Sequence, residues 1–456
     1  MITAIAFIIL IGVLVFIHEL GHFLAARWTG MRAEVFAVGM GPRLFGWNRL
    51  NGFTFGKLPE EIELGENTDY RISALPIGGY VKILGMIDES MDTDFEETEP
   101  QPWEFRSKNT WQKAFVLSAG VIMNILLAIV LFAGIRMAEG ERLWATTTVG
   151  PVTTSGSFAI AHDAGIREGD VIKSVHGESV VNFQEIQRLL YAFQTDEDIP
   201  LEIERNGTPL SLTIARSSIP TDPEDERFGQ FLLPDDVGIA ISSVLGVSAA
   251  DEAGILVGDT IIALDGNPVG SIEQFTGYVE AHDGQQIALK VRRAGRVVAL
   301  KATPDGGKLG VGIVPAYSGP VEVRNYGLFE AIGSGVEMVG THIALLGDLV
   351  SGLVKGNTNL GDNIGGPVAI AKAAGDGLAN GLINFIGLMA SLSVMLAVLN
   401  ILPIPALDGG HLVFVIIEGI TGREVPLKAR MIAQQVGFLV LLAFMVFVIY
   451  NDIAKL

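Results

Sequence analysis

The chain has 456 residues and no Cys, and its 51 acidic against 31 basic residues give a formal net charge of −20. Its mean hydropathy is nevertheless +0.43, so charge and apolarity must be segregated into water-facing parts and membrane segments. An acidic excess argues against nucleic-acid binding, because phosphate contacts need clustered Lys and Arg. Without Cys, any metal site must use His and carboxylates.

Four apolar runs are long enough to cross a membrane, since the hydrocarbon core of a bilayer takes roughly 20 helical residues. They predict membrane-spanning helices at 1–27, 114–136, 377–407 and 431–451. A cleaved signal peptide would begin with basic residues and end in a small-residue cleavage site, and the first run has neither feature. We therefore interpret the first run as a spanning helix of the mature protein.

Basic residues in the short connections predict how these helices are oriented. The connection 408–430 carries Arg423, Lys428 and Arg430, and both ends of the loop 28–113 are also basic. Both loops are therefore expected in the cytoplasm. The long segment between the second and third spans is then expected on the outer side of the membrane.

The central segment contains an internal repeat. Residues 164–180 align with residues 253–269, with eight identities in 17 positions, and each copy is followed by a strand–turn–strand pattern. The repeat predicts two small domains, at 140–219 and 235–317. The shared pattern resembles PDZ domains of the bacterial, circularly permuted kind, which bind extended peptides at a sheet edge. The two domains either bind peptides in this way or serve as spacers.

The other connections contain three distinct segments. In the loop 28–113, strand-like runs around Pro76 and Gly78-Gly79 predict a membrane-associated β-hairpin at about 70–83. The stretch 48–68 and the acidic run 88–99 have the character of insertions, the second of them a solvated loop. Residues 325–356 show helical spacing of apolar side chains and predict an amphipathic helix on the membrane or against the spans.

A metal-binding motif interrupts the first apolar run. His18-Glu19-Leu20-Gly21-His22 is an HExxH sequence, in which two His one helical turn apart share a face and can reach one ion. Glu19 lies beside them, where it could take a proton from a metal-activated water. Ionisable residues are costly inside a membrane, so these residues are candidates for function.

A catalytic zinc needs a third protein ligand, and the best candidate is Asp408. It is the first charge after 31 uncharged residues, and Pro403 and Pro405 prevent regular helix just before it. Irregular backbone at membrane depth is tolerated only where it is buried in protein or lines a cavity. His411 is an alternative ligand.

The pair of motifs resembles a known family. HELGH in the first span, with NILPIPALDGGH at the end of the third, looks like the site-2 protease family of intramembrane zinc metalloproteases. The resemblance implies Zn²⁺ held by His18, His22 and Asp408, with Glu19 as general base and acid. It also implies a set of substrate-binding residues: Asn400, Gly78, Gly79, Tyr80, Asn124, Pro403 and Pro405.

The sequence thus predicts a multi-span α-helical membrane protein with four transmembrane helices, two α/β PDZ-like domains and a membrane-associated β-hairpin. The resemblance implies a multi-pass protease of the bacterial inner membrane that cuts pre-trimmed single-span membrane proteins. Anti-sigma factors and remnant signal peptides are substrates of this type. The PDZ-like pair would exclude untrimmed proteins.

Two other functions compete with this hypothesis. A non-catalytic membrane scaffold could present the PDZ-like domains and keep a structural zinc. A zinc transporter would need polar residues along several spans, whereas the second and fourth spans offer little beyond Asn124, Gln434 and Gln435.

Overall fold

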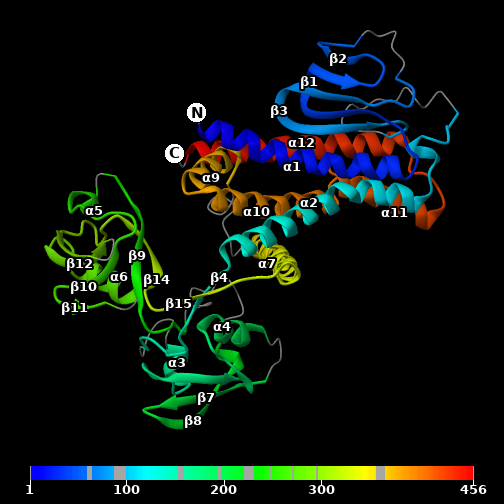
Figure 1. The fold of residues 1–456 in the computed structure, drawn as a ribbon. Helices are drawn as coiled ribbons and strands as arrows, with labels where there is room; N and C mark the ends of the chain where they lie inside the picture. The colour runs from blue at the N-terminus through cyan, green and yellow to red at the C-terminus, as the bar shows by residue number, and fades with distance from the viewer. Residues whose placement is uncertain are drawn as a thin grey trace. The chain divides into compact units, whose positions relative to one another are not determined.

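The computed structural model describes residues 2–58, 64–86, 99–152, 159–192, 197–219, 231–246, 248–269, 272–293, 296–355 and 365–454. They form two compact units: unit 1 contains residues 1–140 and 325–456, and unit 2 contains residues 141–324 (Figure 1). Most of the predicted acidic loop 88–99, and residues 59–63 of the other insertion, lie outside the described residues.

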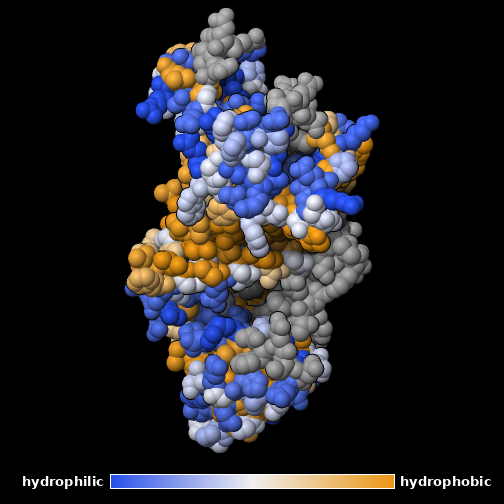
Figure 2. Space-filling model, turned by 90° about the vertical axis from the view of Figure 1, so that its right-hand side faces the viewer, coloured by the Kyte–Doolittle hydropathy of each residue, from blue (hydrophilic) through white to orange (hydrophobic). Residues whose placement is uncertain are grey.

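Unit 1 is built on four helices that are long and apolar enough to cross a membrane. They are α1 (Ile2–Trp28), α2 (Thr110–Glu139), α10 (Leu382–Ile401) and α12 (Leu427–Ala454). Many of their Ile, Leu, Val and Phe side chains are exposed, and Figure 2 shows a broad hydrophobic belt over this bundle. A bilayer would cover such a surface, so the predicted four-span architecture is confirmed.

The ends of α1 and α2 mark one boundary of this belt. The α1 helix ends at Trp28, and α2 begins at a capping box in which Asn109 and Gln112 bind each other's backbone amides. Trp28 and Trp111 are 84% and 85% exposed. Because Trp side chains favour the interface between lipid and water, they place the membrane surface at this level.

Two predicted segments differ in detail from the structure. The run 377–407 is divided between α9 (Pro367–Ala379) and α10, with a turn at Asn380 and Gly381. The predicted loop 408–430 contains the helix α11 (Asp408–Thr421). Its Gly409 and Gly410 lie in the first helical turn, where a Cβ would come within 2.3 Å of the carbonyl oxygens of Ile401 and Ile404. These glycines therefore permit close packing of α11 against the end of α10.

Two further contacts hold the bundle together. The carboxylate of Asp452 on α12 accepts hydrogen bonds from the amides of Gly366, Val368 and Ala369, at 2.8–3.1 Å, and so caps the start of α9. The helix α7 (Leu328–Lys355), within the predicted amphipathic segment, contributes buried Val339 to a core shared with α2 and α10.

The sheet of unit 1 has the strand order β2-β1-β3. Its strands are β1 (Ala33–Asn48), β2 (Gly52–Phe55) and β3 (Asp69–Ile83), and η2 (Phe105–Ser107) follows them before α2. Val38 of β1 pairs with both Ile72 and Gly79. The two arms of β3 therefore do not pair with each other as in a simple hairpin, because the first half of β1 lies between them. The second arm, residues 79–83, forms the outer edge.

Unit 2 contains two domains that share the order helix, strand, strand, helix, strand, strand, and the second domain adds β9 before this series and β14 after it. The strands β4 (Glu141–Trp144) and β15 (Val321–Arg324) pair with each other. The first domain contains α3 (Ala159–Asp163), β5 (Val171–Val175), β6 (Glu178–Ser179), α4 (Phe183–Ala192), β7 (Ile199–Arg205), β8 (Thr208–Ile214) and η4 (Arg216–Ser218). The second contains β9 (Val237–Val244), α5 (Ala249–Glu252), β10 (Thr260–Leu264), β11 (Asn267–Pro268), α6 (Ile272–Ala281), β12 (Ile287–Arg293), β13 (Arg296–Ala302) and β14 (Val311–Tyr317).

The same ion pair closes both domains. Arg205 donates to buried Asp170 through Nε at 2.7 Å and Nη2 at 2.8 Å, and Arg293 donates to buried Asp259 at 2.7 and 2.6 Å. Each Arg also donates to a glycine carbonyl of the repeat motif, at Gly165 or Gly254. The acid that follows each glycine turn is therefore a structural residue, which clamps the turn to the neighbouring strand.

We predict that Arg205→Gln destabilises the first domain in a pH-dependent way. Burial alone would raise the pKa of Asp170, but hydrogen bonds from Arg205 and from the Arg167 amide outweigh it and lower this pKa. A lowered carboxyl pKa stabilises the fold above the unfolded value of about 3.9, and this stabilisation is lost as the pH falls through the folded value. The unfolding temperature should fall by about 5 °C or more near neutral pH, and by less near pH 3.

The measurement is thermal unfolding of the full-length proteins. Protease cleavage within residues 141–324 reports the temperature at which this part of the chain unfolds. Arg188→Gln, an exposed Arg on α4 of the same domain, is the matched control and should change little. Equal effects of the two substitutions would contradict a clamping role for Arg205.

Candidate metal centre

The two His of the HExxH motif lie on the buried face of α1. His18 and His22 are each 8% exposed, and their Nε2 atoms are 3.2 Å apart. The rings come together because residues four apart stand one above the other on a helix. Apolar residues surround the motif along α1, so packing against neighbouring helices fixes this face inward.

Asp408 completes the cluster from the start of α11. Its Oδ2 lies 3.1 Å from His18 Nε2 and 3.3 Å from His22 Nε2. The helix α10 ends at Ile401, and Pro403 and Pro405 occupy the irregular stretch that leads to Asp408. Among the residues that the structure describes, only His18, His22 and Asp408 form a group of His and carboxylates able to share a metal ion.

The geometry of this cluster fits zinc. Two ligand atoms at about 2.0–2.1 Å from a tetrahedral zinc stand about 3.3–3.4 Å apart, close to the three separations seen here. Oδ2 of Asp408 is buried and accepts no regular hydrogen bond from the described residues. Three converging acceptor atoms are therefore suited to a cation, and three ligands leave one tetrahedral position for a reactant.

A backbone carbonyl fixes the tautomer of His22. Its Nδ1 lies 2.8 Å from the carbonyl oxygen of Val116 on α2. Because a carbonyl can only accept, Nδ1 must carry the hydrogen, and Nε2 keeps its lone pair toward the cluster.

Asn124 plays the corresponding part for His18. It is fully buried on α2, with its carboxamide nitrogen 3.2 Å from His18 Nδ1, and its Oδ1 has no partner among the described residues. Turning the carboxamide by about 180° would let Oδ1 accept a hydrogen bond from Nδ1, which leaves Nε2 for a metal. Ser393 holds the backbone of this residue by donating to its carbonyl at 2.8 Å.

Two glycines allow α1 and α2 to approach closely enough for these contacts. A Cβ on Gly21 would lie 2.4 Å from the carbonyl oxygen of Ala119. A Cβ on Gly120 would lie 2.4 Å from His22 Nε2 and 2.6 Å from His18 Cε1. Gly120 therefore leaves the space that the two imidazoles occupy.

Other residues singled out by the sequence surround the cluster. Asn400 Nδ2 lies 3.5 Å from His18 Nε2, and Glu19 packs against Gly79, whose Cβ would stand 3.0 Å from Glu19 Cγ. Gly78 adopts φ 75°, next to Met40. Tyr80 is half-buried beneath the Arg71 guanidinium.

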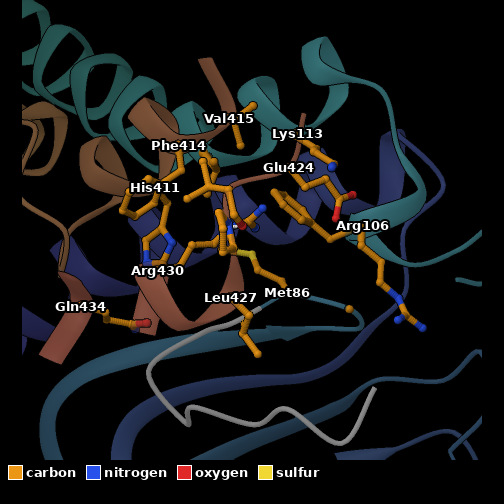
Figure 3. Close-up of a pocket in the computed structure, with 15 residues that line it drawn as sticks. Met86, Arg106, Lys113, His411, Phe414, Val415, Glu424, Leu427, Arg430 and Gln434 are labelled. Carbon is orange, nitrogen blue, oxygen red and sulfur yellow. Dashed lines mark hydrogen bonds between the residues drawn. The ribbon is translucent and has the colours of Figure 1, made fainter. Parts of the chain in front are cut away.

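His411 is placed elsewhere. It lines a cavity of about 420 Å³ together with Lys113, Glu424 and Arg430, and Figure 3 shows its ring on the side of Phe414 and Arg430. It does not belong to the group whose ligand atoms converge. The structure therefore favours Asp408 over His411 as the third ligand.

Sequence reasoning missed two contributors to the centre, Gly120 and the carbonyl of Val116. A backbone carbonyl leaves no trace in the sequence. Gly120 lies four residues before Asn124 in a predominantly apolar spanning helix, which is a weak hint of close helix packing.

Comparison with known proteins identifies the family. The model of peptidase family M50 matches residues 6–444. A regulator of sigma-E protease from Escherichia coli (strain K12) is 31% identical over 99% of this chain and 98% of that protein. A protein from Vibrio cholerae serotype O1, described as a zinc metalloprotease, is 31% identical over the same shares, and one from Pasteurella multocida (strain Pm70) is 33% identical.

We predict that Gly120→Ala abolishes tight zinc binding. The added Cβ would overlap His22 Nε2 and His18 Cε1, so at least one imidazole must leave the cluster. Zinc bound per purified chain, measured by elemental analysis, should fall to a small fraction of the wild-type value. Gly134→Ala is the matched control, because a Cβ there meets nothing within 4 Å on the same helix. Full zinc content in the Gly120 variant would show that the imidazoles do not bind the metal as this geometry requires.

Proposed function

The chain belongs to peptidase family M50 and is a zinc metalloprotease, and from this premise we propose that it cuts peptide bonds within or at the edge of a bilayer. The observation that carries the proposal is the convergence of His18, His22 and Asp408 inside a bundle of membrane-spanning helices. The proposed ligands are these three residues, and the proposed general base and acid is Glu19.

The chemistry divides between the metal and the protein. Zinc bound at such a site would lower the pKa of its bound water and, as a Lewis acid, polarise the scissile carbonyl. Glu19 accepts a proton as the water attacks and returns one to the departing amide nitrogen. We propose that the amide of Asn400, whose Nδ2 lies 3.5 Å from His18 Nε2, donates to the carbonyl oxygen of the substrate as negative charge develops there.

A transmembrane substrate must be opened before it can be cut, because its backbone carbonyls are hydrogen-bonded within the helix. The outer arm of β3, residues 79–83, has one side of its ladder available beyond β1 among the described strands. We propose that the substrate pairs with this edge as an added strand. The contact of Gly79 with Glu19 places the edge beside the proposed base. Pro403 and Pro405 would hold the opened chain from the other side.

The proposed substrates are single-span membrane proteins already trimmed on the outer side, such as anti-sigma factors, and remnant signal peptides. The names of the sigma-E relatives support this class. The PDZ-like domains would lie outside the cytoplasm and exclude untrimmed proteins. We further propose that they bind peptides at their sheet edges. The basic connections support a metal centre toward the cytoplasmic side of the inner membrane.

We predict that Glu19→Gln separates metal binding from catalysis. The substitution removes a proton acceptor but none of the three proposed ligands, so zinc content should stay at the wild-type level. Cleavage of a single-span reporter protein, followed by gel mobility in reconstituted vesicles, should slow by roughly 100-fold or more. Asp408→Ala should lose both zinc and cleavage.

Cleavage at the wild-type rate by the Glu19→Gln variant would show that Glu19 is not the general base. If the wild-type protein binds zinc but does not cleave the reporter, this result would instead favour the hypothesis of a non-catalytic scaffold with a structural zinc.

We also predict that Gly79→Ala reduces turnover without releasing zinc. Its Cβ would lie 2.8 Å from Ala37 O and from Val15 Cγ1, so the β3 edge must shift away from α1. A displacement of about 1 Å can cost roughly 100-fold in rate. The measurements are kcat on the same reporter and zinc content. Gly12→Ala on α1, where a Cβ meets nothing within 4 Å, should change neither quantity. An unchanged kcat in the Gly79 variant would contradict the proposed role of this edge.

A further inference from the structure

A second pocket lies at the end of α1, away from the proposed metal ligands. It is open, has a volume of about 1150 Å³, and is lined by segments from α1, β1, the turn before β3 and the residues around Trp103. None of its lining residues has a part in the chemistry proposed above. The pocket includes part of the 48–68 stretch, which the sequence left without a purpose.

The charge of this pocket is opposite to that of the chain. Its lining contains Arg27, Arg32 and Arg49, with Glu66 as the one carboxylate among the described residues. The ammonium of Lys108 lies 3.5 Å from the Cβ position of Gly30, which also lines the pocket. In a protein with 51 acids and 31 bases, three arginines that line one cavity favour an anionic ligand.

Contacts with neighbouring residues hold Arg32 at the pocket. The Arg32 guanidinium stacks on Trp103 at 3.9 Å and is held by Glu66 Oε1 at 3.0 Å. Its backbone amide donates to the carbonyl of Trp103 at 3.0 Å, so the base of this side chain is fixed as well. Glu66 is 82% exposed, so its ion pair with Arg32 contributes little and can be exchanged for a stronger anion. Planar guanidinium groups bind phosphate oxygens through paired hydrogen bonds.

The pocket lies at the membrane surface. Arg27 occupies the last turn of the spanning helix α1, next to the exposed Trp28. The Trp28 ring contacts Phe115 of α2, close to the exposed Trp111. A phosphate bound between Arg27 and Arg32 would therefore stand at the level of the lipid headgroups.

An apolar face continues from the pocket along β1 and β2. Trp47, which lines the pocket, pairs with Phe53, and Phe45 pairs with Phe55, so these four aromatic side chains share one face. Trp47, Phe53 and Phe55 are 49%, 58% and 77% exposed. Leu50, at the tip between the strands, is 53% exposed and also lines the pocket. Such a row of exposed apolar side chains beside cations suits a ligand with a hydrocarbon tail.

We propose that this pocket is a binding site for one anionic phospholipid. The headgroup phosphate is held by Arg27, Arg32 and Arg49, and an acyl chain lies along the aromatic face of the β1–β2 hairpin. The lipid anchors the sheet of unit 1 to the membrane at the end of α1. A soluble phosphate compound would satisfy the arginines but would leave the aromatic face uncovered.

The test uses the full-length protein purified in a non-ionic detergent and native mass spectrometry of lipid adducts. The probes are dioleoyl phosphatidylglycerol, dioleoyl phosphatidylcholine and inorganic phosphate. We expect one phosphatidylglycerol retained per wild-type chain, and weaker retention of phosphatidylcholine. Arg27→Gln with Arg49→Gln should weaken the phosphatidylglycerol adduct by about tenfold or more.

Matched variants make the result specific to the pocket. Arg423→Gln with Lys428→Gln removes the same charge from exposed positions of the other short connection and should keep the adduct. Arg27→Lys with Arg49→Lys preserves charge and should restore part of the affinity. Unchanged zinc content in every variant shows that the fold is intact.

Three results would overturn the proposal. Equal retention of the two lipids would show that the headgroup charge is not recognised. Equal weakening by the two Gln pairs would show general attraction to the surface. Full displacement of phosphatidylglycerol by millimolar inorganic phosphate would identify the ligand as a soluble phosphate.

Discussion

The close approach of α1 and α2 is the constraint on which the metal centre depends. Gly21 lets the helices meet at Ala119, and Gly120 leaves room for both imidazoles. The same approach brings His22 to the Val116 carbonyl and His18 to Asn124. Without it, α1 would carry two His on a buried face with neither their tautomers nor their ring positions fixed. Helix packing inside a membrane depends on such small residues, because burial from lipid gives no hydrophobic gain.

The third ligand follows from the same kind of packing. Pro403 ends the regular hydrogen bonding of α10, and α11 begins anew at Asp408. Gly409 and Gly410 then press the first turn of α11 against the carbonyls of Ile401 and Ile404. The carboxylate is thus held at a helix start, where the local backbone dipoles favour a negative charge. A Cβ at either glycine would push Asp408 away from the imidazoles of α1.

Much of this was predictable from the sequence, because the chemistry requires particular residue types at fixed spacing. HExxH placed His18 and His22 on one helix face, and the Pro-rich stretch marked Asp408 as an unusual carboxylate at membrane depth. The internal repeat predicted two small domains. The interleaving of β1 between the arms of β3 was missed, because strand order depends on contacts across the fold. The first turn of α11 was missed because a Gly pair is typical of turns, and its packing role appears only against Ile401 and Ile404.

The sheet of unit 1 connects the metal centre to the membrane surface. Its outer arm contacts Glu19 through Gly79, and Phe36 and Tyr70 pack against Phe23 of α1. At the opposite edge of the same sheet, β1 and β2 expose aromatic side chains next to the arginine pocket. Buried Arg43 binds Asp69 at 2.9 Å and the Thr54 and Gly56 carbonyls, so it ties β1, β2 and β3 into one body. The β1–β2 hairpin is therefore connected through one sheet to the edge beside Glu19. In this acidic chain, Arg27, Arg32 and Arg49 therefore lie on the same body that carries the edge beside Glu19.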